Sequence, residues 1–124
     1  MTAQKPLVVV VDDDPGMSRA LARMIEAGGM TPVIHGSAES MLAAGHRAAA
    51  CIVIDVQLPG MDGFQLYETL AARGNRTPIV FISASEEAEA QAREIHDPLV
   101  TFLAKPLSGL TLLETLQALV DKAA

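Results

Sequence analysis

The sequence predicts one α/β domain, a doubly wound (βα)5 sandwich in which a five-stranded parallel sheet carries helices on both faces. Two observations lead to this prediction. Apolar runs rich in β-branched residues alternate five times with segments whose apolar residues recur at helical spacing. The runs are nearly continuous in Val and Ile, which is typical of parallel strands buried on both sides. A chain of 124 residues can bury such a core without disulfides or metals, so we expect residues 1–124 to form a single domain.

The predicted strands are short apolar runs bounded by polar or turn-forming residues, at 7–11, 31–35, 50–55, 78–83 and 99–104. The first helix is predicted over 17–27, where Gly28-Gly29 follows as a C-terminal stop. Its apolar residues share one helical face: Met17, Leu21, Met24 and Ile25. The second helix is short and Ala-rich, begins with Ser37 or Ser40 as its cap, and ends near Gly45.

The third helix is predicted from apolar residues that start at Phe64, and it stops at Gly74-Asn75. The fourth, over 86–95, has only alanines and Ile95 to pack, so we expect it to be loosely held. The last helix has Ser108 as its predicted cap. Its predicted apolar stripe consists of Leu110, Leu113, Leu116, Leu119 and Val120.

Composition excludes several classes of protein. The net charge is −6 and the nine Lys and Arg residues are scattered, which argues against direct nucleic-acid binding. The lone Cys51 lies in an apolar run, so we expect a buried thiol and no disulfide framework. The absence of a signal peptide or of a long apolar segment predicts a cytoplasmic domain that makes no membrane contact. His35, His46 and His96 lack metal-ligand spacing, and the latter two are expected at helix C-terminal ends.

Four of the predicted strands end on polar residues. Asp12-Asp13-Asp14 follow the first strand, Asp55 ends the third, Ser83 ends the fourth and Lys105 follows the fifth. The carboxyl ends of parallel strands lie at one edge of a sheet, and in the flavodoxin-like strand order 2-1-3-4-5 the first and third strands flank the usual ligand site. We therefore expect these side chains to converge there. Asp14 is expected only to start the first helix.

This set of side chains fits phosphoryl transfer to a carboxylate. Crowded carboxylates repel one another unless a cation lies among them, and Mg²⁺ suits a site whose ligands are all oxygens. Lys105 would neutralise phosphoryl oxygens, and Ser83 would offer them a hydroxyl. A carboxylate is already ionised at neutral pH and needs no general base. Asp55 stands alone on its strand, which makes it the predicted nucleophile.

Four segments contain these strand ends: VVVDDD at 9–14, IDVQLPGMDG at 54–63, ISA at 82–84 and FLAKP at 102–106. Together they resemble the receiver domains of two-component response regulators, the CheY-like superfamily, over essentially the whole chain. The resemblance implies that Asp55 accepts a phosphoryl group from a histidine kinase or a histidine phosphotransfer protein. It also implies a Mg²⁺ ion held by Asp12, Asp13, Asp55 and the backbone carbonyl of Gln57.

The resemblance assigns further roles around the phosphoryl group. Ser83 and Lys105 contact that group, and Phe102 matches the aromatic residue that turns inward during switching. Gln57 and Ser85 occupy variable positions that tune the access of water to the site. The structural positions in these motifs are Gly63 and Pro106.

Phosphorylation adds about −1.5 to −2 charges and new acceptor oxygens, which would shift the population toward a second conformer. We expect the readout at a surface formed by the fourth helix, the fifth strand and the fifth helix, where a downstream protein would bind. A homodimer through this surface is a further expectation to be tested. Residues 96–99 replace the small turn that the family often has before the fifth strand, so the shape of this surface is expected to differ.

Three other functions are less well supported. An aspartyl phosphohydrolase needs an acid two residues beyond the nucleophile, where this chain has Gln57. A nucleotide-binding domain needs a Gly-rich loop after the first strand, where Gly16 is isolated. A pseudo-receiver that acts by constitutive contact would not need the complete set of acidic, hydroxyl and lysine residues. We therefore expect a regulatory domain rather than a metabolic enzyme, with no output domain in this chain, acting alone or as part of a longer protein.

Overall fold

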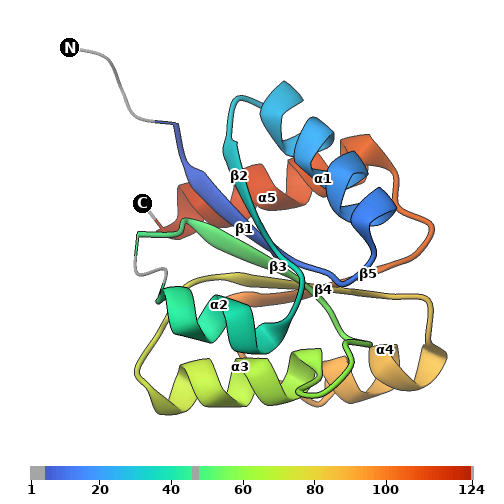
Figure 1. Cartoon of the computed structure of the whole chain (residues 1–124). Helices are drawn as coiled ribbons and strands as arrows, with labels where there is room; N and C mark the ends of the chain where they lie inside the picture. Colours follow the sequence, from blue (N-terminus) through green and yellow to red (C-terminus); the bar gives the residue numbers. More distant parts are fainter. Residues whose placement is uncertain (1–4, 46–47, 124) are drawn as a thin grey trace.

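The computed structural model describes residues 5–45 and 48–123, which form a five-stranded parallel sheet in the order β2-β1-β3-β4-β5 (Figure 1). The strands are β1 (Leu7–Val11), β2 (Thr31–His35), β3 (Cys51–Asp55), β4 (Ile79–Ser83) and β5 (Val100–Ala104). The helices are α1 (Pro15–Ala27), α2 (Ala38–Ala44), α3 (Gly63–Ala72), α4 (Glu86–Arg93) and α5 (Gly109–Ala123). Fold class and strand order are thus confirmed.

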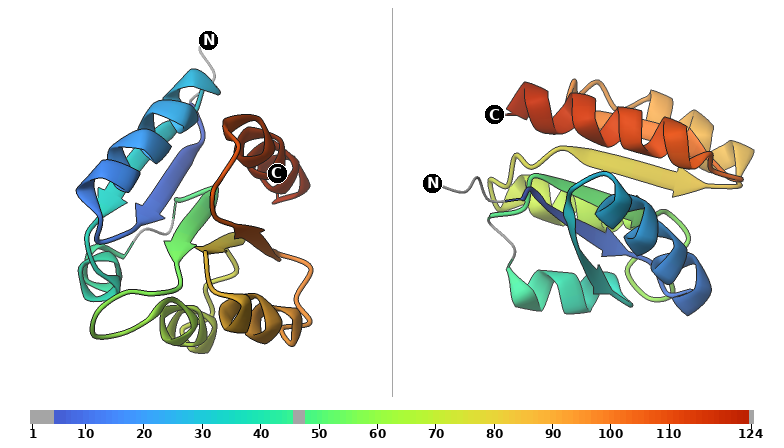
Figure 2. Two further views of the ribbon diagram at one scale, coloured as in Figure 1. Left: turned by 90° about the vertical axis from the view of Figure 1, so that its right-hand side faces the viewer. Right: turned by 90° about the horizontal axis from the view of Figure 1, so that it is seen from above.

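The sheet separates two layers of helices. Helices α1 and α5 cover one face, and α2, α3 and α4 cover the other (Figures 1 and 2). Alternate residues of β1 enter different cores: Val8 and Val10 pack beneath α1 and α5, whereas Val9 and Val11 pack beneath α2, α3 and α4. Burial on both faces explains why the strands are continuous apolar runs.

Local capping residues set the helix boundaries. Asp14 caps α1, because its Oδ1 accepts hydrogen bonds from the backbone nitrogens of Gly16 at 2.9 Å and Met17 at 3.4 Å. The predicted role of Asp14 is confirmed, although the helix begins at Pro15 rather than at Met17. Ser37 caps α2, with its hydroxyl oxygen accepting from the Ser40 nitrogen at 3.0 Å.

Two further details of the helices differ from the prediction. Helix α4 ends at Arg93, two residues early, so His96 lies exposed in the following loop rather than at a helix end. On α5, Leu110 is 68% exposed and Leu112 is buried in its place. The helix begins at Gly109, and the buried spacing of Leu112, Leu116 and Leu119 turns Leu110 away from the sheet. His46 lies outside the described residues.

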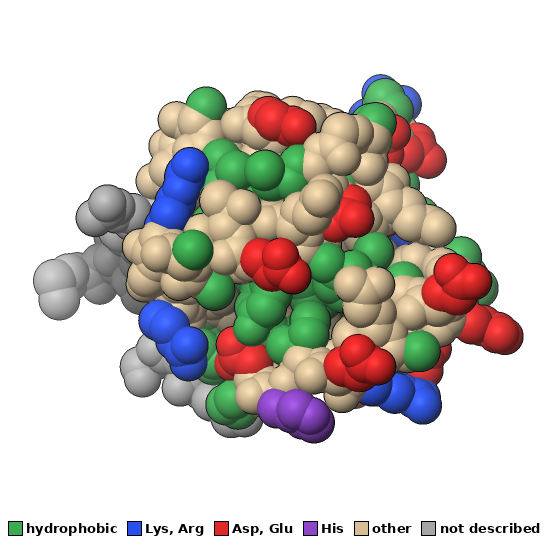
Figure 3. Space-filling view, turned by 90° about the horizontal axis from the view of Figure 1, so that it is seen from below, with side chains coloured by type: hydrophobic (Ala, Val, Ile, Leu, Met, Phe, Trp, Pro, Cys, Tyr) green, Lys and Arg blue, Asp and Glu red, His purple; other side chains and the backbone are tan. Residues whose placement is uncertain are grey.

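The outer surface of the layer formed by α2, α3 and α4 carries more acidic than basic side chains (Figure 3). This distribution agrees with the net charge of −6. Within the described part of the chain, no helix is long and apolar enough to span a membrane.

Candidate functional site

Three carboxylates meet where β1 and β3 end. Asp12 and Asp13 follow β1, and Asp55 is the last residue of β3. Each offers one oxygen, and these oxygens all lie within 4.8 Å of one another. Asp12 and Asp55 are buried, at 2% and 5% exposure, whereas Asp13 is exposed. The strand ends therefore bring the three acids together, as the sequence predicts.

Asp12 has one satisfied oxygen and one that lacks a partner. Its Oδ1 accepts a hydrogen bond from the Asp14 nitrogen at 2.9 Å, while Oδ2 is buried with no hydrogen-bond partner among the described residues. Burial raises the pKa of Asp12, the Asp14 hydrogen bond opposes this shift, and the charge of Asp55 adds to it. An unpaired buried acceptor beside two other carboxylates suits a hard divalent cation, so these residues fit Mg²⁺.

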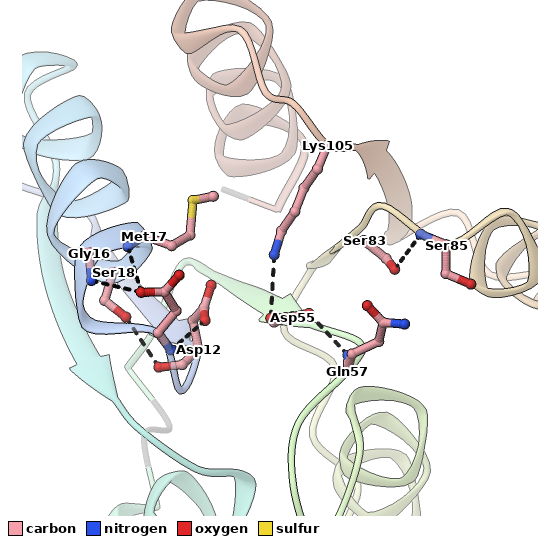
Figure 4. A network of polar contacts seen from close by, with 10 residues as sticks. Asp12, Gly16, Met17, Ser18, Asp55, Gln57, Ser83, Ser85 and Lys105 are labelled. Atoms are coloured by element: carbon pink, nitrogen blue, oxygen red, sulfur yellow. Dashed lines mark hydrogen bonds and ion pairs between the residues drawn. The ribbon is translucent and has the colours of Figure 1, made fainter.

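Asp55 is held from two sides (Figure 4). Its Oδ1 accepts a hydrogen bond from the Gln57 nitrogen at 3.0 Å, and its Oδ2 lies 3.4 Å from the Lys105 Nζ. Lys105 directly follows β5, and its backbone nitrogen donates a hydrogen bond to the Ser83 carbonyl at 2.9 Å. Asp55 and Lys105 are 50 positions apart in the sequence, and the order of the strands in the sheet brings them together.

Ser83 lies at the end of β4 and is 1% exposed. Its Oγ accepts a hydrogen bond from the Ser85 nitrogen at 3.0 Å. The N-cap of α4 is Ser85, whose Oγ accepts from the Ala88 nitrogen at 3.2 Å. Ser83 is therefore not the helix cap, and in Figure 4 its hydroxyl points toward the Ser85 nitrogen rather than toward Asp55.

Phe102, Gly63 and Pro106 lie around this centre rather than in it. Phe102 is half-buried on β5 and packs against the core beneath α2, α3 and α4. A Cβ atom on Gly63 would lie 2.8 Å from the Asp55 carbonyl oxygen, so only glycine lets α3 start this close to β3. Pro106 follows Lys105 through a cis peptide bond.

Sequence reasoning missed a buried hydroxyl that supports the acidic loop. Ser18 is 3% exposed, and its Oγ donates to the Asp12 carbonyl at 3.1 Å. Its spacing from Leu21 and Ile25 places it on the apolar face of α1. A lone serine on that face was the available signal, because a buried hydroxyl needs a partner.

The acidic cluster borders a shallow hollow of about 240 Å³ between α1 and β2. A larger hollow of about 720 Å³ lies at the opposite end of the sheet, near Arg73 and Arg76. Asp12 and Asp13 line the smaller hollow, whereas none of the polar residues at the carboxyl ends of the strands lines the larger one. The smaller hollow is therefore the one that adjoins the candidate site.

The family model for the response regulator receiver domain matches residues 8–117. The chain belongs to this family. The receiver domain is 33% identical over 119 residues to nodulation protein W of Bradyrhizobium diazoefficiens, covering 95% of this chain and 52% of that protein. It is 29% identical over 118 residues to the transcriptional regulatory protein FixJ of Azorhizobium caulinodans, covering 94% and 56% respectively. The receiver domain thus spans about half the length of these curated relatives.

Solved structures show the same fold. A sensor protein from Polaromonas sp. JS666 has a TM-score of 0.85 at 31% identity, covering 98% of this chain and all of that chain (100%). The receiver domain of the Francisella response regulator 1452 has a TM-score of 0.86 at 24% identity, with coverage of 97% and 100%. The expected family and fold class are both confirmed.

Proposed function

We propose that this receiver domain takes part in two-component phosphorelay signalling by accepting a phosphoryl group on Asp55. The observation that carries the proposal is the setting of the Asp55 carboxylate, with Lys105 Nζ 3.4 Å from one oxygen and two further carboxylates close by. The donor would be a phosphohistidine of a histidine kinase or of a histidine phosphotransfer protein. The phosphorus–nitrogen bond of the donor breaks, a bond from phosphorus to an Asp55 oxygen forms, and the imidazole leaves with a proton.

Each neighbouring group has a proposed part in this step. Asp12, Asp13, Asp55 and the Gln57 carbonyl would hold Mg²⁺, which supplies positive charge to the phosphoryl oxygens when bound. Lys105 would neutralise phosphoryl oxygens, because its ammonium already lies beside the Asp55 carboxylate. Gln57 and Ser85 flank the site and would tune how readily water reaches the phosphoryl group.

The proposed switch uses the weak packing of α4. Among the residues of this helix, Ala88 and Ala92 are the buried apolar ones, so few contacts oppose its movement. The Ser83 hydroxyl would turn from the Ser85 nitrogen toward the new phosphoryl oxygens, and Phe102 would turn inward. The surface formed by α4, β5 and α5 would then be recognised by a downstream protein or by an output segment of a longer polypeptide. The role is regulatory, and catalysis is limited to self-phosphorylation and slow dephosphorylation.

Phosphorylation can be tested with acetyl phosphate, Mg²⁺ and intact mass measurement. We expect one added phosphoryl group on the wild type and none on Asp55→Asn, which keeps the size of the side chain. Omission of Mg²⁺ should prevent the addition. An unmodified wild type, or an adduct that persists in Asp55→Asn, would contradict the assignment.

The switch and its partners need separate measurements. Hydrogen exchange should rise or fall in α4 and β5 on phosphorylation, and an unchanged pattern would count against this readout. Size-exclusion chromatography with and without acetyl phosphate tests the expected homodimer. A cytoplasmic location stays a prediction of the sequence.

A further inference from the structure

The first turn of α2 contacts the loop that follows the phosphoacceptor strand. Glu39, the second residue of α2, accepts a hydrogen bond at its Oε2 from the Met61 nitrogen at 3.1 Å. Met61 lies in the loop 56–62 between β3 and α3. Figure 2 shows this loop swinging out beside α2 before α3 begins.

The loop is shaped to approach this carboxylate. Gly60 has a φ of +74°, and a Cβ atom there would lie 2.9 Å from the Glu39 Oε2. A side chain at Gly60 would be strained by its backbone conformation and would crowd Glu39. The hydrogen bond between Glu39 and Met61 therefore depends on a backbone conformation at Gly60 that glycine adopts without strain.

The same turn of α2 is also connected to the metal-binding side of the site. The Asp12 nitrogen donates to the His35 carbonyl at 3.1 Å, and the His35 Nδ1 lies 2.9 Å from the Ser40 Oγ in a hydrogen bond. The start of α2 is thus linked through His35 to the residue that follows β1, and through Met61 to the loop that follows β3.

We propose that Glu39 is a positioning residue that holds the loop 56–62 so that the Gln57 carbonyl stays directed at the metal site. This inference rests on the proposed function and extends it to a residue outside the receiver motifs. At one end of the loop, the Gln57 nitrogen donates a hydrogen bond to the Asp55 carboxylate. At the other end, the Asp62 nitrogen donates to the Gln65 side chain of α3. Among the described residues, Glu39 supplies the hydrogen bond that ties the intervening part of the loop to a separate element.

Loss of the Glu39 hydrogen bond would make the loop 56–62 more mobile and weaken Mg²⁺ binding. Without the Glu39 acceptor, the Met61 amide is left to water and the loop samples more conformations. Fewer of those conformations present the Gln57 carbonyl correctly, and the apparent affinity for Mg²⁺ falls with that fraction.

The test compares three variants. Glu39→Ala removes the acceptor and the charge, whereas Glu39→Gln removes the charge but keeps an acceptor oxygen. Glu87→Ala is the matched control, because Glu87 is also the second residue of a helix capped by serine and is exposed. Mg²⁺ affinity is measured by titration, and amide exchange is measured at Met61 and Gln57 in Mg²⁺-free protein.

We expect Glu39→Ala to weaken Mg²⁺ binding by roughly two- to tenfold and to speed exchange at Met61 by a similar factor, as loss of one hydrogen bond allows. Glu39→Gln and Glu87→Ala should stay within about twofold of the wild type on both readouts. Equal losses in Glu39→Gln and Glu39→Ala would overturn the inference, because charge alone would then explain them. Unchanged affinity and exchange in Glu39→Ala would overturn it as well.

The outcomes separate this inference from the proposed function. A wild type that binds Mg²⁺ and accepts a phosphoryl group, with Glu39→Ala unchanged, removes the positioning role alone. A wild type that binds no Mg²⁺ overturns both proposals.

Discussion

Replacing Gly63 with alanine should test how closely the start of α3 is fitted to β3. Gly63 is the first residue of α3, and its nitrogen donates to the Val56 carbonyl at 2.9 Å. An added Cβ would lie 2.8 Å from both the Asp55 carbonyl oxygen and the Val56 Cα. These are backbone atoms, so relief of the clash requires α3 or the end of β3 to shift.

The size of the effect follows from two opposing terms. Overpacking against backbone costs about 3 kcal/mol at the upper end of its usual range, and replacing a helical glycine with alanine returns about 1 kcal/mol. The net loss is about 2 kcal/mol. For a domain of 124 residues the unfolding entropy is about 0.26 kcal/mol/K, so the melting temperature should fall by about 8 °C.

The assay is thermal unfolding followed by circular dichroism in Mg²⁺-free buffer. Gly36→Ala is the control, because no atom of the residues that the structure describes lies within 4 Å of a Cβ at Gly36, and its φ is outside the left-handed region. This control should unfold at the wild-type temperature or slightly above it, since alanine restricts the unfolded chain. A melting temperature for Gly63→Ala equal to or above that of the wild type would refute the reasoning from close approach.

Three further predictions concern titratable groups. Asp12→Asn should raise the melting temperature without Mg²⁺, because burial and the charge of Asp55 oppose ionisation of Asp12. Added Mg²⁺ should stabilise the wild type more than the variant. A variant that is less stable than the wild type in both buffers contradicts this prediction. Tyr67→Phe loses the 3.0 Å hydrogen bond to Asp97 and about 1 kcal/mol of stability. Because burial and then that hydrogen bond raise the pKa of Tyr67 above 10.0, the wild type should lose stability as pH rises past that value, and denaturant unfolding should show a weaker loss in Tyr67→Phe. Burial raises the pKa of Cys51 to about 12, so iodoacetamide at neutral pH should modify the denatured but not the native protein, as intact mass would show.

The parts of the fold that were predicted correctly are those governed by local pattern. Strand β1 is an unbroken apolar run, and such a run is stable only when both faces are buried. Asp14 before Pro15 signals a helix start, and the structure has that cap. The convergence of the carboxylates followed from the rule that the carboxyl ends of parallel strands lie at one edge of the sheet.

The errors arose where tertiary packing selects between similar local patterns. Leu110 and Leu112 are both apolar and lie within the same turn of α5, yet only the orientation of the helix on the sheet decides that Leu112 is buried. The early end of α4 has a similar origin: Ile95 packs against the core from the loop beyond the helix.

The sequence by itself determined the α/β class, the strand order expected of the family and the residue types at the carboxyl edge. These properties depend on periodicity and on the ends of apolar runs, which are visible within short windows. Only the tertiary structure decided that Lys105 lies 3.4 Å from Asp55 and that Glu39 accepts a hydrogen bond from Met61. It also decided that Asp12 has a buried oxygen with no hydrogen-bond partner in the described part of the chain. The two contacts join residues far apart in the sequence. Their geometry, like the burial of Asp12, depends on side-chain direction and on how whole elements pack, which no local pattern records.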